Sequence, residues 1–301
     1  MSAGGEGGAA MSDHNDLTDK TYERHERGGG RRGGRGGRGG GRGAGQDRTV
    51  QVSRALSKLL RHQAEMVGIS LDDGGFARLD KVLAHGPIRS MKVTFDDVQS
   101  VVAENDKQRF SMKPNPETNA SGSLDTKEPS HWLIRANQGH SIKLDSAAVL
   151  QPVTLEAGNV PARVIHGTFF ASWPAIVAAG GLKPMGRNHV HCSAGVPGED
   201  EGVVSGMRRD AELVVEIDVE GSLREGGVKW WRSDNDVLLT EGDEQGLVSC
   251  RFFKLVTGRR IDVGVLWRDG EKVADLPAGL KVRPPPGKGH RGGRGGRNRG
   301  S

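Results

Sequence analysis

One short stretch of the chain gathers a guanidinium group and two imidazoles with no carboxylate beside them. It runs from Met185 to His191 and contains Arg187, His189 and His191. The two histidines alternate around one apolar residue, which is the period of a β-strand, so both imidazoles are expected on one face of a strand. That face would be polar and functional. The alternative is a pair of solvated histidines on an edge strand beside a surface arginine.

Two further places along the chain offer related side chains. His166, Gly167 and Thr168 end a β-branched run, so that an imidazole and a hydroxyl flank a glycine that would let a ligand lie against the backbone. Arg61 and His62 fall in the last turn of a predicted helix. Cations are favoured near a helix C-terminus by the dipole alone, so this pair has a structural explanation as well as a functional one.

The candidates are cations and imidazoles, and these types indicate the chemistry. Guanidinium groups bind phosphate oxygens through paired hydrogen bonds and stabilise charge that grows in a transition state. The sequence contains no P-loop, no dinucleotide-binding glycine motif, no metal-ligand cluster and no paired-carboxylate signature. We therefore predict a site without a metal for a substrate that carries several phosphates. The candidates are Arg61, His62, Arg109, His166, Arg187, His189 and His191.

A helical region is expected to position the first of these residues. Apolar residues repeat at helical spacing, and a capping-box sequence that begins at Thr94 precedes a further apolar helix. A hairpin follows, and residues 113–130 between its strands, rich in Pro, Asn, Ser and Thr, are predicted to form a mobile insertion. Three helices and a hairpin predict a winged-helix-like lobe over residues 49–150, a common scaffold for RNA binding, although the fold alone does not establish binding. The expected helices span 52–63, 79–83 and 95–104, and the expected strands lie near 110 and at 132–136.

The sequence changes to short strands after a linker within residues 152–161. One helix, from Trp173 to Ala179, interrupts the strands and is expected to stop at Gly180, because glycine is favoured just past a helix C-terminus. Mostly antiparallel strands with one helix predict an α+β lobe over residues 151–280. The expected strands span 163–166, 189–193, 213–219, 237–240 and 250–256.

The two ends of the chain differ in composition from its middle. Residues 1–48, first acidic and then rich in Arg-Gly-Gly repeats, and residues 281–301, also rich in these repeats, contain few apolar side chains. Both are predicted to be disordered tails. Arg-Gly-Gly repeats can follow a phosphate backbone and stack on bases, although a solubilising tail or a methylation substrate has the same composition. The sequence pI of about 9.3 reflects these ends, because the middle of the chain is mildly acidic.

Cysteine content and hydropathy indicate the compartment. Two cysteines, Cys192 and Cys250, are too few for a disulfide framework or a thiolate zinc site, which fits a reducing environment. No apolar run is long enough to span a membrane, and the N-terminus has no signal-peptide core. We expect an intracellular monomer, cytoplasmic or nuclear, with no membrane partner.

Five blocks of the sequence resemble the tRNA 2′-phosphotransferase family, in the same order and at similar spacing. They extend from the predicted helix that carries Arg61 to the stretch that carries Arg187. The blocks are Leu56-Ser57-Lys58-Leu59-Leu60-Arg61-His62, Glu104-Asn105-Asp106-Lys107-Gln108-Arg109-Phe110, Gln138-Gly139-His140-Ser141-Ile142-Lys143, Ile165-His166-Gly167-Thr168 and Met185-Gly186-Arg187-Asn188-His189-Val190-His191.

The resemblance implies a fold and a reaction. An ADP-ribosyltransferase-like lobe at 151–280 would join the winged-helix-like lobe, with NAD+ bound between them and consumed as a co-substrate. The RNA substrate would carry an internal 2′-phosphate, as left in tRNA by splicing. That phosphate would attack C1 of the nicotinamide ribose and release nicotinamide. The ribose 2″-hydroxyl would then attack the phosphorus, giving 2′-hydroxyl RNA and ADP-ribose 1″,2″-cyclic phosphate.

The resemblance also assigns residues. The arginines of its essential quartet would hold the 2′-phosphate and the transition-state charge, while the histidine would act on a proton or an oxygen. The second set would bind NAD+, mainly at its nicotinamide end. The quartet falls on Arg61, His62, Arg109 and Arg187, and the NAD+-binding set falls on His166, Gly167, Thr168, His189 and His191.

Other functions stay open beside this one. Related ADP-ribosyltransferases often carry a glutamate on a later strand, where this chain has Val237, and an apolar residue there argues against a protein-modifying enzyme. One alternative is an NAD+-dependent ADP-ribosyltransferase that caps terminal phosphates of nucleic acid, because the first step is shared. The other is a non-catalytic RNA-binding protein.

Overall fold

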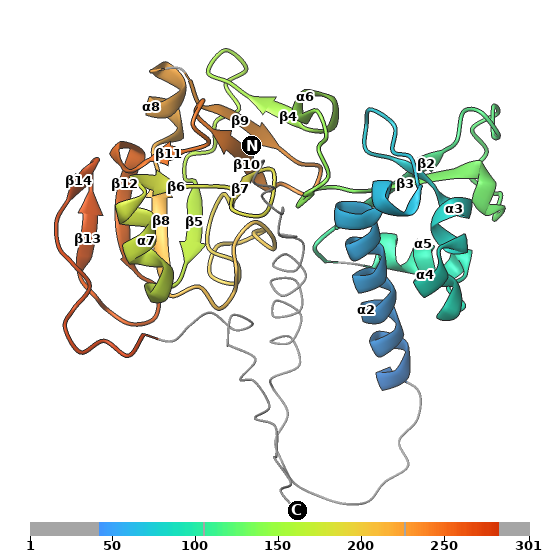
Figure 1. Cartoon of the computed structure of the whole chain (residues 1–301), viewed down its shortest axis with the longest axis horizontal. Coiled ribbons are helices and arrows are strands. Elements are labelled where there is room, and N and C mark those ends of the chain that lie inside the picture. The colour runs from blue at the N-terminus through green and yellow to red at the C-terminus, as the bar shows by residue number, and fades with distance from the viewer. Residues whose placement is uncertain (1–41, 105, 226, 283–301) are drawn as a thin grey trace, which may run out of the picture.

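The computed structural model describes residues 42–282 except 105 and 226, with the backbone alone for residues 42–47. Figure 1 shows two halves: helices with a small sheet at one end, and strands with few helices at the other. Each half has its own hydrophobic core. Leu56 and Val98 belong to the first core, and Val215 and Trp230 belong to the second. The mixture of helices and antiparallel strands confirms the predicted α+β class.

The first helix, α2 (Arg42–Lys58), begins before the expected start of ordered structure. The prediction of disorder is therefore wrong for residues 42–48. Arg48 explains the difference, because its guanidinium binds the Asp97 carboxylate at 2.6 and 2.8 Å and donates to the Lys92 carbonyl at 2.9 Å. Residues 1–41 and 283–301 of the predicted tails lie outside the described residues.

Three shorter helices follow, α3 (Leu79–Ala84), α4 (Gly86–Ser90) and α5 (Phe95–Ala103). The predicted capping box begins α5: the Thr94 hydroxyl accepts from the Asp97 N–H, and the Asp97 carboxylate accepts from the Thr94 N–H. The sequence did not predict α4, because a five-residue helix with proline in its first turn carries no periodic pattern.

A three-stranded sheet completes this half, in the order β1 (Ala77–Arg78), β3 (Trp132–Ala136) and β2 (Phe110–Pro114). The antiparallel β2–β3 pair is the predicted hairpin, in which Phe110 faces Ala136 and Pro114 faces Trp132. No sequence pattern predicts β1, since two residues are too few to show alternation.

Hydrogen bonds tie down the loop between β2 and β3, which was predicted as a mobile insertion. Asn115 is 2 % exposed and donates from Nδ2 to the Ser130 carbonyl at 3.1 Å. Trp132 donates from Nε1 to the Thr126 carbonyl at 2.9 Å. Buried polar side chains thus hold a loop whose composition alone indicates an open one.

Antiparallel strands build the second half. The larger sheet has the order β14-β13-β12-β8-β5, a second has the order β4-β9-β10-β7, and β11 pairs with β6. The strands are β4 (Gln151–Val153), β5 (Ile165–Thr168), β6 (Gly181–Leu182), β7 (Val190–Cys192), β8 (Leu213–Ile217), β9 (Lys229–Arg232), β10 (Leu238–Gly242), β11 (Val248–Ser249), β12 (Phe253–Gly258), β13 (Val265–Arg268) and β14 (Glu271–Lys272).

Three helices accompany these strands, α6 (Ser146–Val149), α7 (Trp173–Ala178) and α8 (Val219–Arg224). The predicted end of α7 is confirmed, because Gly180 follows it at a φ of 77°, in the left-handed region that favours glycine. Among the helices of the described residues, none has the length and apolar composition needed to cross a membrane.

The predicted strands match β5, β7, β8, β10 and β12 apart from their ends. The range predicted to contain the linker, residues 152–161, begins inside β4, where Pro152 pairs with Trp231 of β9. Proline is tolerated there because β4 is at the edge of its sheet and needs no second row of hydrogen bonds. The sequence did not predict β4, β6, β9, β11, β13 or β14.

Candidate active site

A pocket of about 660 Å³ is lined by both halves of the molecule. From the first half come the side chains of Arg61, Lys107, Arg109 and Gln138. The second half contributes β5, α7 with the turn before it, and three further segments. These described segments are residues 181–187, 189–191 and 205–208.

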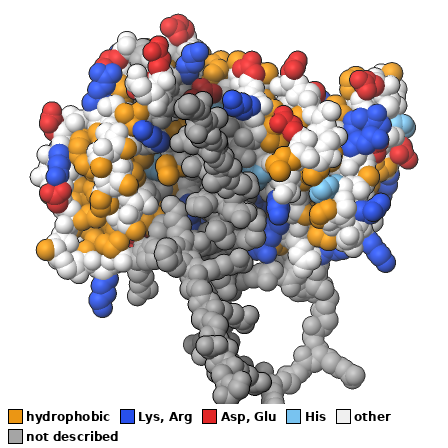
Figure 2. All heavy atoms as spheres, viewed as in Figure 1, with side chains coloured by type: hydrophobic (Ala, Val, Ile, Leu, Met, Phe, Trp, Pro, Cys, Tyr) orange, Lys and Arg blue, Asp and Glu red, His pale blue; other side chains and the backbone are white. Residues whose placement is uncertain are grey.

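The pocket has an apolar part as well as a cationic one. Ala175 and Ile176 of α7 and Leu182 of β6 line it, and Figure 2 shows hydrophobic side chains gathered over the region of α7. Cations suit phosphate groups, whereas this apolar wall suits a ring. A ligand that combines the two fits the pocket as a whole.

Arg61 enters the pocket from a π-helical turn, Leu59–Gln63, which continues α2. The predicted helix is therefore present, but its last turn is wider than an α-helix, a distortion that is frequent at functional sites. The Arg61 carbonyl accepts hydrogen bonds from the N–H groups of Ser141 and Ile142, at 3.0 and 3.3 Å. These bonds fix the turn against the loop that follows β3.

His62 is the member of the expected quartet that does not line the pocket. Its Nδ1 lies 2.9 Å from the Ser141 hydroxyl, in the loop that also binds the Arg61 carbonyl. A hydrogen bond at one ring nitrogen decides how the other nitrogen is presented. The structure thus brings the three arginines of the quartet together, Arg61, Arg109 and Arg187, and orients His62 beside the first of them.

His166 and His191 form a chain of hydrogen bonds with the backbone. His166 donates from Nδ1 to the His191 carbonyl, and His191 donates from Nδ1 to the His189 carbonyl, both at 2.9 Å. Burial lowers the pKa of His166, and it lowers the pKa of His191 well below the ordinary value, with the charge of Arg187 acting in the same direction. Both rings are therefore neutral and suit an uncharged part of a ligand.

His189 lies just before β7, and its ring is engaged by the protein. Its Nε2 is 2.9 Å from the Ser146 hydroxyl and 3.2 Å from a Glu241 carboxylate oxygen, and Ser146 also donates to Glu241. Burial lowers the pKa of His189, while the Glu241 carboxylate acts in the opposite direction. The sequence showed no carboxylate beside these imidazoles, but folding brings Glu241 of β10 to one of them.

Gly167 is needed for a reason other than the expected one. A Cβ at this position would lie 2.3 Å from Met207 Cγ and 2.8 Å from Ala211 Cβ. The missing side chain therefore makes room for the 205–208 segment rather than for a ligand. Gly167 still lines the pocket, between His166 and the buried Thr168.

The same segment adds a cation that the sequence did not single out. The Arg208 guanidinium lies 4.7 Å from the centre of the Phe169 ring and 3.1 Å from an Asp210 carboxylate oxygen. Both contacts hold the guanidinium in place beside β5. No periodic pattern or motif marks residues 205–208, which explains why the sequence did not indicate them.

The charged side chains that line the pocket are all positive. Its described lining residues include no carboxylate. No group of three or more metal-binding side chains occurs among the residues that the structure describes. Guanidinium and ammonium groups gathered in this way suit anionic oxygens. The lining cations are Arg61, Lys107, Arg109, Lys183, Arg187 and Arg208.

Two of the residues missed by sequence reasoning stand inside the blocks quoted above. Lys107 lies two positions before Arg109, and Gln138 begins the block that contains Ser141, so the blocks held the signal. Val237, which we expected to stand in place of a glutamate, is fully buried in a cluster with Val149 and does not line the pocket among the described residues.

Comparison with known proteins gives one family. The family model described as "RNA 2′-phosphotransferase, Tpt1 / KptA family" matches residues 47–242. This range contains every described residue that lines the pocket.

Several curated proteins are similar over most of their own length. A tRNA 2′-phosphotransferase 1 from Danio rerio is 39% identical over 208 residues, covering 69% of this chain and 85% of that protein. The tRNA 2′-phosphotransferase 1 of Mus musculus is 37% identical over 238 residues, covering 79% and 88%. The tRNA 2′-phosphotransferase of Saccharomyces cerevisiae is 40% identical over 195 residues, covering 64% and 79%.

Proposed function

The chain belongs to the RNA 2′-phosphotransferase family, and on that basis we propose how its pocket removes an internal 2′-phosphate from spliced tRNA with NAD+ as the acceptor. The observation that carries the proposal is the convergence of Arg61, Arg109 and Arg187, from three separate segments, on one pocket without a described carboxylate. Three guanidiniums so placed suit one phosphate on the RNA and two in NAD+.

Two steps account for the products. In the first, an oxygen of the RNA 2′-phosphate attacks C1 of the nicotinamide ribose, and the bond from C1 to nicotinamide breaks with its electron pair leaving on nicotinamide. In the second, the ribose 2″-oxygen attacks the phosphorus, and the bond from phosphorus to the RNA 2′-oxygen breaks. One proton passes from the 2″-hydroxyl to the RNA 2′-oxygen. The products are 2′-hydroxyl RNA, nicotinamide and ADP-ribose 1″,2″-cyclic phosphate.

Arg61, Arg109 and Arg187 hold the phosphates and stabilise the charge that grows at phosphorus in the second step. We assign the proton transfer of that step to His62. Two features support this role: His62 follows Arg61 in the sequence, and its Nδ1 is held by the Ser141 hydroxyl. A small rotation of the ring or a bound RNA has to bring it to the reacting oxygens.

The nicotinamide end of NAD+ is assigned to β5 and β7. His166, Gly167 and Thr168 line the pocket there, and His191 faces them through its carbonyl. The neutral state of His166 and His191 suits the nicotinamide ring of NAD+, because a neutral imidazole does not repel the positive charge that this ring carries before it leaves. His189 lies beside these residues, and its ring is held by the Ser146 hydroxyl and the Glu241 carboxylate.

The proposal extends to the organisation of the chain. Residues 49–150 form a winged-helix-like lobe that faces RNA, and residues 151–280 form an ADP-ribosyltransferase-like lobe; the two separate hydrophobic cores support this division. The Arg-Gly-rich segments, residues 27–41 and 281–301, add affinity for RNA without taking part in the chemistry. The enzyme acts as an intracellular monomer.

The test is a product analysis with purified full-length protein, NAD+ and a short RNA that carries one internal 2′-phosphate. We expect nicotinamide and cyclic-phosphate ADP-ribose in amounts equal to the 2′-hydroxyl RNA formed. A second RNA with a 5′-phosphate and no 2′-phosphate tests end capping. If a lasting ADP-ribose adduct forms on the 5′-phosphorylated RNA alone, end capping replaces the proposed function. If neither RNA reacts, the proposed catalysis is refuted.

Arg187→Ala is the decisive variant. Loss of one charge-assisted contact to a reacting phosphate lowers kcat/KM by about 10²–10³-fold. The matched control is Arg224→Ala, because Arg224 is 68% exposed on α8 and pairs only with Glu220 among the ion pairs of the described residues. The control is expected to retain wild-type kcat/KM, and both variants are expected to retain the circular dichroism spectrum.

A further inference from the structure

Lys107 and Arg109 reach the pocket from a backbone segment in a costly conformation. Gln108, between them, has a φ of 44°, in the left-handed region that favours glycine. A non-glycine residue held there costs about 1 kcal/mol or more and persists only when its surroundings impose it. Lys107 and Arg109 flank this residue and both line the pocket, so the contacts that impose this φ also decide where the cations lie.

The carbonyls of residues 107, 108 and 109 each accept a hydrogen bond. Asn235 donates from Nδ2 to the Lys107 carbonyl at 2.8 Å. Asn137 donates from Nδ2 to the Gln108 carbonyl at 2.8 Å and from its backbone N–H to the Arg109 carbonyl at 2.9 Å. Both asparagine residues are buried, 3% and 8% exposed for Asn137 and Asn235, so these bonds do not compete with bulk water.

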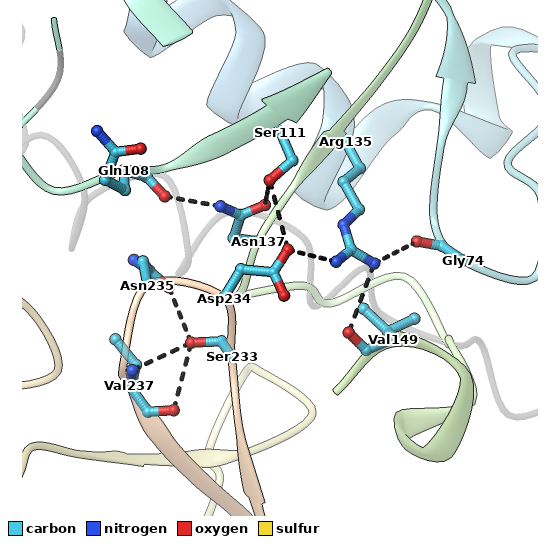
Figure 3. Close-up of polar contacts among 10 residues, drawn as sticks. All are labelled: Gly74, Gln108, Ser111, Arg135, Asn137, Val149, Ser233, Asp234, Asn235 and Val237. Atoms are coloured by element: carbon cyan, nitrogen blue, oxygen red, sulfur yellow. Dashed lines mark hydrogen bonds and ion pairs between the residues drawn. The ribbon is translucent and has the colours of Figure 1, made fainter. Parts of the chain in front are cut away.

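The turn between β9 and β10 orients the Asn235 amide. The Ser233 hydroxyl donates to Asn235 Oδ1 at 2.8 Å and accepts from the Val237 N–H at 3.1 Å. Because Oδ1 is taken by a donor, Nδ2 is the atom presented to the Lys107 carbonyl. Figure 3 shows this turn lying against Gln108 and Asn137.

An ion pair holds the same turn against the first half. Arg135 of β3, whose side chain is 11% exposed, donates from Nη2 to Asp234 Oδ2 at 2.6 Å and from Nη1 to the Gly74 carbonyl at 2.9 Å. The Ser111 hydroxyl lies 2.7 Å from Asn137 Oδ1 and 3.4 Å from Asp234 Oδ2. The two asparagines are thus linked through Ser111 and Asp234, as Figure 3 shows.

We propose that Asn137 and Asn235 are positioning residues that clamp the 107–109 backbone and thereby place Arg109 for the 2′-phosphate. The inference rests on the proposed function, since it needs Arg109 to contact the RNA phosphate. Neither asparagine lines the pocket among the described residues, so neither touches the substrate. Loss of the donor at Asn235 leaves the Lys107 carbonyl with the Ser205 hydroxyl, at 3.5 Å, as its remaining donor, and the segment relaxes away from a left-handed φ.

Asn235→Asp tests the clamp, because it keeps the shape of the side chain and replaces the donating amide group by an acceptor. We expect kcat to fall about 10–100-fold, as for a misplaced catalytic group. We also expect the ratio of affinities for 2′-phosphorylated over unphosphorylated RNA of the same sequence, measured by fluorescence anisotropy, to fall about tenfold. The matched control is Asn159→Asp, because Asn159 also donates from Nδ2 to a backbone carbonyl, that of Pro152, at 2.9 Å.

A double-variant cycle separates positioning from general support of the fold. If Asn235 acts through Arg109, the affinity ratio of Asn235→Asp combined with Arg109→Ala equals that of Arg109→Ala alone. A further loss in the double variant, or an unchanged ratio and kcat in Asn235→Asp, overturns the clamp. Asp234→Asn, at a side chain 42% exposed, repeats the test with a milder change if Asn235→Asp does not fold. A wild-type protein with no preference for the 2′-phosphate refutes the proposed function instead.

Discussion

His140 provides the sharpest prediction of pH dependence. It lies in the loop that binds Arg61, is 6% exposed, and its carbonyl accepts from the Asn188 N–H at 3.0 Å. Burial, followed by positive charge nearby, lowers the pKa of its imidazole to about 3. The groups that oppose its protonation are Arg61, His62, His189 and Arg135. The ring therefore stays neutral in the folded protein between pH 7 and pH 5.

The size of the effect follows from the two pKa values. In the unfolded chain His140 has the ordinary pKa of 6.5, so below that pH the unfolded state binds a proton that the folded state does not. Stability from this group is complete above pH 6.5 and is lost as the pH falls towards 3. Between pH 7 and pH 5 the free energy of unfolding decreases by about 2 kcal/mol because of His140 alone. Protonation of His166, His189 and His191 acts in the same direction.

Urea unfolding of the wild type and of His140→Gln, each at pH 7 and pH 5, isolates this contribution. The packing lost through the substitution costs the same free energy at both pH values and cancels, so the difference between the two pH responses reports the titration of His140 alone. We expect the wild type to lose about 2 kcal/mol more than the variant on acidification. Equal losses would show that His140 is accessible to protons in the folded state, and the argument from burial would be refuted.

Three further variants test single contacts. Ser141→Ala removes the hydroxyl beside His62 Nδ1 and is expected to lower kcat about tenfold with little change in KM for NAD+, measured by steady-state kinetics. Thr94→Ala removes the cap of α5 and is expected to lower the free energy of unfolding by about 1 kcal/mol in urea titration. Gly167→Ala places a methyl group against Met207 and is expected to raise KM for NAD+ and to cost about 1–3 kcal/mol of stability.

The elements that the sequence predicted well share a local cause. The capping box at Thr94, the glycine after α7 and the alternating strands are each fixed by residues within a few positions, and all are present in the structure. The π-helical turn at Arg61 is different, because its apolar spacing is that of an α-helix and only the contact with Ser141 and Ile142 marks it. Local pattern thus gives the element, and distant contacts give its exact geometry.

Composition was misleading where a few polar contacts decide the structure. Residues 42–48 read as tail, yet one bidentate ion pair between Arg48 and Asp97 joins their helix to α5. The loop after β2 reads as open, yet buried Asn115 ties it to the hairpin. Glycine and polar residues lower the average hydropathy of a segment, but the average does not show which polar side chains form hydrogen bonds or ion pairs. The boundary of a disordered segment predicted from composition therefore carries an error of several residues.

The candidate site divides along the same line. Arg61, Arg109 and Arg187, which line the pocket, stand in recognisable blocks of the sequence, so they could be named before their positions were known. Asn235 is 128 residues from the carbonyl it binds, and no spacing rule joins it to Arg109. Loss of the positioning residue Asn235 displaces the Arg109 guanidinium but leaves its charge in the pocket. It should therefore reduce catalysis less than loss of the guanidinium itself. A graded series follows, in which Arg109→Ala lowers kcat more than Asn235→Asp, and Asn235→Asp lowers it more than Asp234→Asn.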